Sequence, residues 1–261
     1  MLVFPQLSSG ANVQYPLART EASRTVVNVL QDGSMVKFED VSGGRTRWEL
    51  RLDSLDEAER QAVEAVFLAT EGELQTFTLL DPTVNLLSWS EDLSKPAWVA
   101  EPLLQVVAGS SDPTGGTGAW QLTNAGQASQ QVSQTIAGPG QFEYCFSVYV
   151  RGTGNAGLAR STTGAPPDVR TFPLSATWQR ISSAGRLGGA SNTFQAAIVL
   201  EAGATVQVFG PQLEAQPAPG PYRRSQGASG AIQVRFEGGQ LRTIAGGLDR
   251  NSSVIRLVSV E

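Results

Sequence analysis

The chain contains no histidine and a single cysteine, Cys145, and this excludes most nucleophilic chemistry. Without histidine there can be no Ser-His-Asp or Cys-His pair, no histidine base and no histidine-ligated zinc. The sequence around Cys145 offers no evident base or cationic neighbour, so we interpret this residue as a small packing residue. Any catalysis would depend on carboxylates, and we expect no metal site and no cofactor.

Two pairs of carboxylates could serve a glycosidase, namely Glu91-Asp92 and Asp53-Asp56. That mechanism needs two carboxyl groups about 5 to 10 Å apart across a cleft, one of them with a raised pKa. Glu91-Asp92 belongs to a Ser-Glu-Asp turn, and Asp56 begins an expected helix, where negative charge favours the helix dipole. We therefore expect no enzyme. A glycosidase is the alternative, and it would lose turnover when one Asp or Glu is replaced.

Aromatic side chains could instead bind sugars, because flat rings stack on the apolar faces of sugar rings. Three tryptophans fall within motifs that bracket one domain, and we interpret them as core residues: Trp89, Trp98 and Trp178. The candidate glycan contacts are Trp120 and Tyr149, with Arg151 and Gln195 as hydrogen-bond partners of hydroxyl groups. Polar residues on the solvent face of a sandwich also occur without any such role.

The composition indicates what kind of fold must position these residues. A chain of 261 residues has room for one large or two ordinary domains, and we expect two. With 41% hydrophobic and 16% charged residues, 28 Gly and 14 Pro, it suits a turn-rich, mainly β fold. The net charge of −5 supplies no basic field for phosphates, so nucleic acid is not expected as a partner.

The sequence also bears on where the chain is made. One cysteine cannot form an internal disulfide, and synthesis in a reducing cytoplasm fits this best. The start, MLVFPQLSSGANVQYP, has no positively charged region and no long apolar core. No run of roughly 18 apolar residues occurs elsewhere. We therefore expect neither a signal peptide nor a membrane span.

The first segment carries hairpin and strand signals. Asp32-Gly33 separates the apolar runs 25–30 and 35–41, and such a dipeptide favours a tight turn because glycine adopts positive φ without strain. A further strand is expected over residues 45–52. Its Trp48, Leu50 and Leu52 share one face, which must pack against another element.

An amphipathic helix is expected to cover that face. Ser54 and Glu57 have the spacing of a capping box, and Gly72 stands where a helix would end. Between them, small and apolar residues recur at three- and four-residue steps. Another strand is expected over residues 74–79, before the break at Asp81-Pro82.

The pattern changes between Asn85 and Arg224, where helix signals disappear and short β runs alternate with Gly, Pro, Ser and Asn clusters. This spacing is typical of a sandwich or jelly roll. The clearest strand is QFEYCFSVYVRG, residues 141–152, whose more apolar face carries Tyr144 and Phe146. Cys145 falls on the other, less apolar face.

Residues 225–261 return to simple strand patterning, with Gly238-Gly239 as the expected hairpin turn. So short a segment cannot bury a core of its own without disulfides or metal. We expect it to complete the sheet of the first domain. The predicted organisation is a discontinuous domain of residues 1–84 and 225–261, with residues 85–224 inserted at a surface loop.

The order RTVVNVLQDGSMVKFED…TRWELRLDSLDEAERQAVEAVFLATEGELQTFTLLDP, within residues 13–83, resembles the minor tail and distal-tail proteins of long-tailed bacteriophages. In that family a DG hairpin, a Trp- or Phe-bearing strand, one helix ending in Gly and an F-x-x-x-D/P strand follow one another. The resemblance implies an α+β tail-protein β-sandwich domain that forms a homo-oligomer, a hexameric ring at the distal tail. Its implied partners are the tail tube, tape-measure and hub proteins. An anonymous α+β domain is the alternative.

The segments FSVYVRG, TWQRIS and VQVFGPQLEAQPAPGPYRRS occur in the order seen in jelly-roll modules of the carbohydrate-binding type. In those modules, and in similar ones on phage fibres, NLL-x-x-S-E-D with a later Trp opens the domain and G-P-Q-L-E…Y-x-R closes it. The resemblance implies a module over residues 85–224. Many relatives have an acidic residue before the L-E strand that helps to hold calcium. Gly210-Pro211 stand there in this chain, so that site is not carried over.

Together these features predict a non-catalytic structural component of a bacteriophage tail tip or baseplate, located in the virion and made in the host cytoplasm. The ring-forming adaptor would carry an outward jelly roll that contacts host-surface glycan. The alternative is a free-standing non-catalytic carbohydrate-binding protein that binds sugar as a monomer. Within the structural class, the jelly roll could also be decorative and contact only neighbouring tail proteins.

Overall fold

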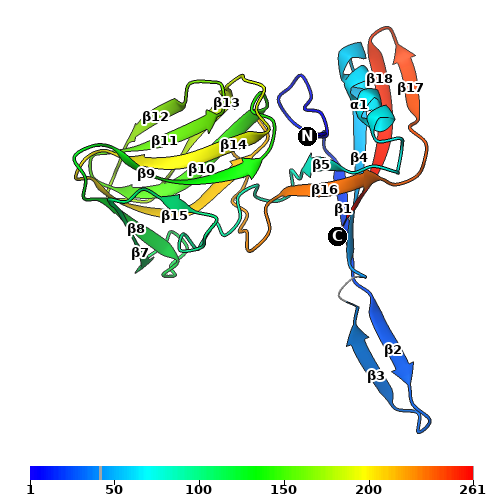
Figure 1. Cartoon of the computed structure of the whole chain (residues 1–261), viewed down its shortest axis with the longest axis horizontal. Helices are drawn as coiled ribbons and strands as arrows, with labels where there is room; N and C mark the ends of the chain where they lie inside the picture. The colour runs from blue at the N-terminus through cyan, green and yellow to red at the C-terminus, as the bar shows by residue number, and fades with distance from the viewer. Residues whose placement is uncertain (41–42, 261) are drawn as a thin grey trace. The chain divides into compact units, whose positions relative to one another are not determined.

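The structure is a computed structural model, and it describes residues 1–40 and 43–260 (Figure 1). These described residues form a mainly β fold with one α-helix. The chain divides into two compact units: unit 1 consists of Met1–Leu7, Val13–Leu79 and Ile232–Glu261, and unit 2 of Ser8–Asn12 and Leu80–Ala231. The predicted organisation, a discontinuous domain of residues 1–84 and 225–261 with residues 85–224 inserted, stays a prediction.

Unit 1 is built on a six-stranded sheet with the order β1-β4-β18-β16-β5, and β17 also pairs with β18. The strands are β1 (Leu17–Ala22), β4 (Arg45–Leu55), β5 (Phe77–Leu80), β16 (Ala231–Phe236), β17 (Thr243–Gly247) and β18 (Arg250–Ser259). The last strand pairs with β4 in a register that sets Leu257 opposite Trp48. The C-terminal strands therefore belong to the same sheet as strands from the first part of the chain.

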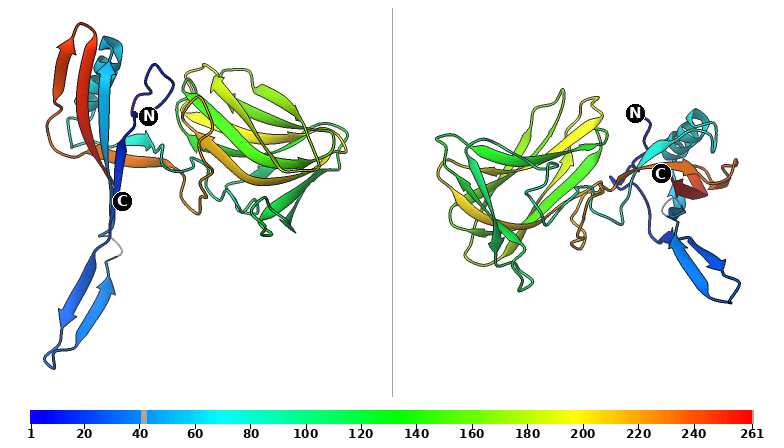
Figure 2. Two further views of the ribbon diagram at one scale, coloured as in Figure 1. Left: turned by 180° about the vertical axis from the view of Figure 1, so that it is seen from behind. Right: turned by 60° about the horizontal axis from the view of Figure 1, so that its bottom comes forward.

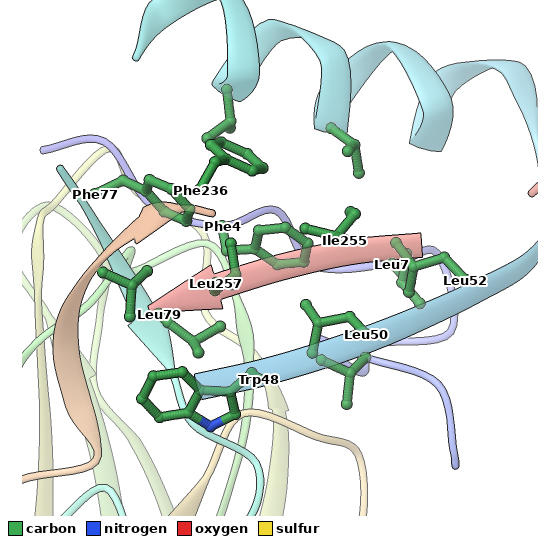
Figure 3. Packing of buried hydrophobic residues seen from close by; sticks show 14 of the residues in the cluster. Phe4, Leu7, Trp48, Leu50, Leu52, Phe77, Leu79, Phe236, Ile255 and Leu257 are labelled. Atoms are coloured by element: carbon green, nitrogen blue, oxygen red, sulfur yellow. The ribbon is translucent and has the colours of Figure 1, made fainter. Parts of the chain in front are cut away.

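The core of unit 1 lies between this sheet and the single helix α1 (Glu57–Ala69), as Figure 3 shows. Trp48, Leu50 and Leu52 share the buried face of β4, as their alternation predicts. Ile255 and Leu257 of β18 extend this face. The helix contributes the buried side chains Val63 and Val66.

The capping box of α1 is formed by Asp56 and Glu59, so the expected Ser54–Glu57 box is wrong. The Asp56 carboxylate accepts a hydrogen bond from the Glu59 N–H (2.7 Å), and the Glu59 carboxylate accepts one from the Asp56 N–H (3.0 Å). Strand β4 continues to Leu55, which pairs with Asn251, and this keeps Ser54 out of the helix. The helix ends at Ala69, shortly before the expected Gly72, whose φ is +69° and whose N–H donates to the Phe67 carbonyl.

The predicted DG hairpin is confirmed as β2 (Thr25–Val29) paired with β3 (Met35–Glu39). The Asp32 carboxylate accepts hydrogen bonds from the N–H and hydroxyl of Ser34 and so closes the turn. Every residue of both strands is exposed. Val41, the last residue of the expected second strand, lies outside the described residues.

The expected hairpin turn at Gly238-Gly239 is wrong. Strands β16 and β17 both pair with β18, at opposite ends of it, so the glycines lie in a connection between strands that are not hairpin partners. The hairpin turn of this region lies between Gly247 and Arg250, which face each other across β17 and β18. Asp249 takes the positive φ there (56°), a conformation that aspartate tolerates better than most residues.

Unit 2 is a jelly-roll sandwich of two five-stranded antiparallel sheets, visible in two further views in Figure 2. The sheet ordered β13-β10-β15-β8-β7, here the β10 sheet, contains β7 (Leu104–Ser110), β8 (Ala119–Asn124), β10 (Glu143–Gly152), β13 (Gln179–Arg186) and β15 (Thr205–Glu214). The sheet ordered β12-β11-β14-β9-β6, here the β14 sheet, contains β6 (Val99–Ala100), β9 (Gln130–Ala137), β11 (Asn155–Thr162), β12 (Asp168–Pro173) and β14 (Thr193–Leu200). The strand predicted over residues 141–152 is confirmed as β10.

The less apolar face of β10 is also buried where Cys145 lies. Cys145 stands opposite Glu214 of β15 and is completely buried. Burial, with a smaller contribution from the Glu214 charge, raises the pKa of the thiol to about 12. A thiol that stays protonated is a poor nucleophile, so the geometry supports a packing role.

Candidate functional site

The four candidate glycan contacts do not form one site. Trp120 lies on β8 opposite Val208 of β15, and Val208 is fully buried. Residues directly opposite on paired strands point to the same face, so Trp120 is directed towards the sandwich interior. Its indole Nε1 donates a hydrogen bond to the Glu91 carbonyl (3.0 Å). A glycan contact at Trp120 stays a prediction, although the indole N–H is already bonded to the Glu91 carbonyl.

Tyr149 and Arg151 share the outer face of β10, where guanidinium groups alternate with aromatic rings. The Arg151 guanidinium carbon lies 4.9 Å from the centre of the Trp178 ring, and that of Arg180 lies 5.5 Å from the Tyr149 ring. Arg151 also donates to the Ser111 hydroxyl (2.6 Å). These rings stack on arginine of the same chain, which leaves less ring surface for a sugar.

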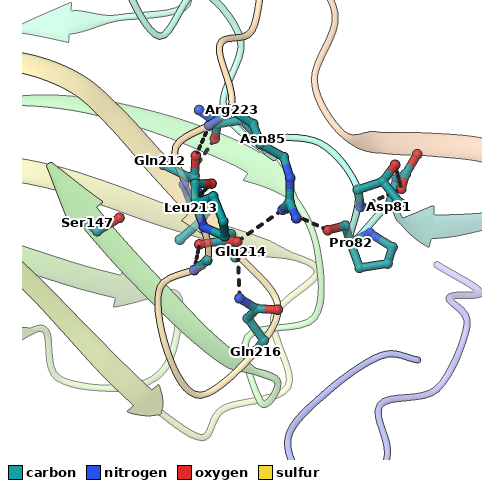
Figure 4. A network of polar contacts seen from close by, with 12 residues as sticks. Asp81, Pro82, Asn85, Ser147, Gln212, Leu213, Glu214, Gln216 and Arg223 are labelled. Carbon is teal, nitrogen blue, oxygen red and sulfur yellow. Dashed lines mark hydrogen bonds and ion pairs between the residues drawn. The ribbon is translucent and has the colours of Figure 1, made fainter. Parts of the chain in front are cut away.

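Part of the same outer face is occupied by residues 216–224, which fold back over β15. The Gln212 side chain donates to the Pro221 carbonyl (3.1 Å), and the Gly220 N–H donates to the Glu214 carboxylate (2.9 Å). Figure 4 shows this network, in which the Glu214 carboxylate also pairs with Arg223 (3.3 Å). Gln212 and Glu214 are buried, so this part of the face is closed to a ligand.

Gly210 explains how the folded-back segment fits so closely. Its φ is +59°, and a Cβ built there would lie 2.7 Å from the ring of Tyr222. The Tyr222 ring packs against Phe209 with ring centres 5.5 Å apart, and its hydroxyl lies 2.9 Å from the Ser90 hydroxyl. Gly210 thus serves ring packing in this chain.

Gln195 lies on the opposite sheet, on the outer face of β14, in a shallow groove of about 260 Å³. The groove is lined only by hydroxyl and amide residues: Thr135, Ser161, Thr162, Thr163, Thr193 and Gln195. The Gln195 amide accepts a hydrogen bond from Ser161 (3.1 Å) and donates to Ser133 (3.3 Å) and Thr135 (3.4 Å). We call this the Gln195 groove. Its side chains are held in place by one another, as a preformed polar site requires.

A larger cavity of about 430 Å³ lies on the other side of the β11–β12 loop. Its lining contains three arginines and one aspartate besides apolar residues: Arg160, Pro166, Pro167, Asp168, Arg170, Ala184, Gly185, Arg186 and Leu187. We call it the arginine cavity. Sequence reasoning missed it because its residues come from three strands and two loops. The available signal was Arg160, which stands at an inward position of β11 in the alternation Ala156, Leu158, Arg160.

Arg160 is buried in the sandwich, and each of its guanidinium nitrogens donates at least one hydrogen bond. Its guanidinium donates to the carbonyls of Tyr144 (3.1 Å) and Gly185 (2.7 Å) and to the Ser183 hydroxyl (3.1 Å). It also pairs with the Asp168 carboxylate. These contacts neutralise the buried charge, as a stable buried arginine requires.

Glu91 and Asp92, which were considered for a glycosidase, serve local structure. Glu91 accepts from the Tyr222 hydroxyl (3.1 Å) and pairs with Arg224 (3.0 Å). Hydrogen bonds from Ser94 hold the pKa of Asp92 below its ordinary value, whereas a general acid needs a raised pKa. That the chain is not an enzyme stays a prediction. Within residues 1–40 and 43–260, no group of three or more Cys, Asp or Glu side chains is placed to hold a metal ion.

No helix in the described part of the chain is long and apolar enough to cross a membrane.

No protein-family model matches the sequence, and no curated protein matches it. The chain is similar to the CBM22-1 xylan-binding domain of Paenibacillus barcinonensis Xyn10C, at 16% identity and a TM-score of 0.40, over 52% of this chain and 96% of that chain.

Two further solved structures are similar to the same extent. TmCBM61, solved in complex with β-1,4-galactotriose, matches 49% of this chain and 97% of its own at 14% identity and a TM-score of 0.38. The enzymatically active domain of bacteriophage CBA120 tailspike protein 4 matches 52% of this chain at 12% identity and a TM-score of 0.41. The match spans 22% of that tailspike chain. All three similarities concern the fold over about half of this chain.

Proposed function

We propose that this chain is a non-catalytic adaptor that binds a glycan through unit 2 and associates with copies of itself through unit 1. The observation that carries the proposal is the Gln195 groove, whose lining residues bear only hydroxyl and amide groups. Such groups both donate and accept hydrogen bonds, as sugar hydroxyls do. The groove therefore matches an uncharged, hydroxyl-rich ligand better than an apolar or ionic one.

The lining of the Gln195 groove affects how tightly it would bind a sugar. It offers no aromatic ring among its lining residues, so the stacking that strengthens many sugar sites is missing there. A shallow, polar contact of this kind gives low affinity, because little apolar surface leaves water. Several linked copies would bind far more tightly than one, since each further contact forms at high effective concentration. Function through this groove therefore calls for an oligomer.

Unit 1 presents a surface suited to forming that oligomer. Large apolar side chains on both faces of the β2–β3 hairpin are each more than a third exposed: Val26, Val27, Val29, Leu30, Met35, Val36 and Phe38. An isolated two-stranded hairpin is marginally stable in water, and an apolar surface of this extent indicates a binding partner. The tip carries Asp32. Hydrogen bonds from Ser34 lower the pKa of this carboxyl group below its ordinary value. A charged tip disfavours insertion into a membrane.

A second copy of the chain is the partner we propose for the hairpin. Strand β17 of the same unit pairs with β18, exposes all five of its residues and carries the half-exposed Ile244. A hairpin from one copy lying against β17 of the next is a head-to-tail contact, and such contacts close into rings when the rotation permits. The sequence resemblance to distal-tail proteins supports a hexameric ring at a bacteriophage tail tip, against tail tube, tape-measure and hub proteins. The alternative is a free-standing carbohydrate-binding monomer.

The assembly is tested by mass photometry and negative-stain electron microscopy of the purified chain. We expect rings from the natural sequence and monomers from a Val29→Asp/Phe38→Asp variant, because charges on the exposed hairpin oppose burial. Leu68→Asp/Leu74→Asp is the matched control, since both leucines are exposed in unit 1 outside the hairpin. A monomer from the natural chain, or rings from the hairpin variant, would remove the assembly part of the proposal.

The glycan contact is tested on an array of neutral and acidic glycans with the assembled chain. We expect a Gln195→Ala variant to lose signal on the glycans that the natural chain binds, because three hydrogen bonds that organise the groove are removed. Gln121→Ala, a change on the other sheet, is the control and should keep the signal. Equal binding by both variants would exclude the Gln195 groove as the site.

A further inference from the structure

The arginine cavity lies at the open edge of the sandwich, where the last strands of the two sheets, β12 and β13, face each other. Its floor is the ion pair between the buried Arg160 and the partly exposed Asp168, and its walls carry Arg170 and Arg186. We infer that this cavity binds the carboxylate of an acidic sugar residue. The inference rests on the proposed function, because it assigns a charged unit to the glycan that the neighbouring groove contacts.

The charge of the cavity is not balanced by its own residues. Arg160 is paired with Asp168, and Arg186 is paired with Glu143, whose side chain is largely covered and lies 3.5 Å from the Arg186 Nε. Arg170 therefore determines the net charge that a ligand meets. Arg170 is exposed and, in the described part of the chain, has no carboxylate within ion-pair distance. A surplus of positive charge in a chain with a net charge of −5 favours a negative ligand.

The remaining lining residues indicate that the anion is part of an organic molecule. Pro166, Pro167 and Leu187 form apolar walls, and prolines hold such walls with little freedom. A guanidinium group binds a carboxylate through two parallel hydrogen bonds, and this geometry suits a sugar acid. The apolar walls would contact the C–H face of the sugar ring, which inorganic phosphate does not have.

The cavity and the Gln195 groove share one loop. Thr163 lines the groove, while Pro166 and Pro167 of the same β11–β12 loop line the cavity. Gly189 packs closely against this loop, because a Cβ at that position would lie only 3.1 Å from the Thr163 carbonyl. An oligosaccharide crossing the loop would set a neutral unit in the groove and an acidic unit in the cavity.

The test is calorimetric titration of the full chain with hexagalacturonate and with its fully methyl-esterified counterpart, which has the same sugar backbone but no charge. We expect the acid to bind about tenfold more tightly than the ester, as one charge-assisted pair provides. In an Arg170→Gln/Arg186→Gln variant the two should bind equally, with affinity for the ester unchanged. Arg24→Gln/Arg45→Gln, which removes two exposed arginines from unit 1, is the matched control and should keep the preference.

The outcomes separate the two proposals. This inference is wrong if the ester binds and the acid binds no more tightly, or if the acid still binds more tightly in the Arg170→Gln/Arg186→Gln variant. Either result leaves the proposal for the Gln195 groove intact. If the acid binds through these arginines but Gln195→Ala leaves the affinity unchanged, the inference about the cavity is supported and the proposal for the Gln195 groove is wrong. Binding of neither oligosaccharide overturns both. Tighter binding of inorganic phosphate than of the acid, lost in the same variant, would replace the sugar acid by a phosphate.

Discussion

Asn85 is expected to be the polar anchor that joins the start of unit 2 to its last strand, and its loss should unfold that unit at low denaturant. The side chain is 1% exposed. Its amide nitrogen donates to the Pro211 carbonyl (2.9 Å), and its oxygen accepts from the N–H groups of Leu87 (3.0 Å) and Leu213 (3.0 Å). The change to test is Asn85→Ala.

The magnitude follows from what the substitution leaves behind. Three buried backbone groups lose a partner, and a buried polar group without a partner costs about 1–3 kcal/mol. The costs are not additive, because the segment can shift towards water, so we expect a loss of about 3–5 kcal/mol in the free energy of unfolding. A domain has a total stability of only about 5–15 kcal/mol. The variant should therefore be close to unfolding at physiological temperature.

Urea unfolding followed by tryptophan fluorescence measures this loss. Four of the five tryptophans lie in unit 2, so the main fluorescence change reports on that unit: Trp89, Trp98, Trp120 and Trp178. The control is Asn155→Ala on the partly buried start of β11, which should change stability by less than about 0.5 kcal/mol. A loss below about 1 kcal/mol in Asn85→Ala would refute the reasoning, since it would mean that the three groups find other partners.

Two further predictions concern unit 2. Hydrogen bonds from the Thr114 hydroxyl and the Gly118 N–H, with smaller contributions from Gly116 and Thr114 N–H groups, lower the pKa of Asp112 to about 2. A lowered folded-state pKa stabilises the fold above the unfolded pKa of about 3.9 and loses that effect as pH falls through the folded value. Asp112→Asn should therefore melt lower than the natural chain at pH 7, and the gap should shrink between pH 4 and pH 2. A gap independent of pH would contradict this. Cys145 should react with a thiol reagent at pH 8 only on unfolding, because burial raises its pKa to about 12; rapid labelling of the folded chain would exclude the buried placement.

Local sequence signals were sufficient for several elements of the fold. The DG turn, the amphipathic helix and the strand over residues 141–152 depend on neighbours in the chain, and the structure has all three. Alternation along β4 also identified the buried face with Trp48 and Leu50. These predictions hold because turn chemistry and side-chain periodicity are set by neighbouring residues.

The errors arose where a distant strand decides between two local possibilities. Both Ser54–Glu57 and Asp56–Glu59 have capping-box spacing, and the pairing of Leu55 with Asn251 selects the second. Gly238-Gly239 has the composition of a hairpin turn, but β18 offers one edge to both β16 and β17. These strand pairings join residues far apart in the chain, so no local sequence pattern predicts them.

For the candidate site, too, local sequence patterns did not show which surfaces the fold leaves open to a ligand. Alternation correctly places Tyr149 and Arg151 on the outer face of their strand, but it does not show that residues 216–224 return to cover part of that face. The groove at Gln195 and the cavity at Arg170 are likewise assembled from strands far apart in sequence. A polar outward residue therefore identifies a surface, whereas only the fold shows whether that surface is open. In unit 2, the Gln195 groove and the arginine cavity are open polar surfaces on the β14 sheet and at its edge, and there a search for a glycan should begin.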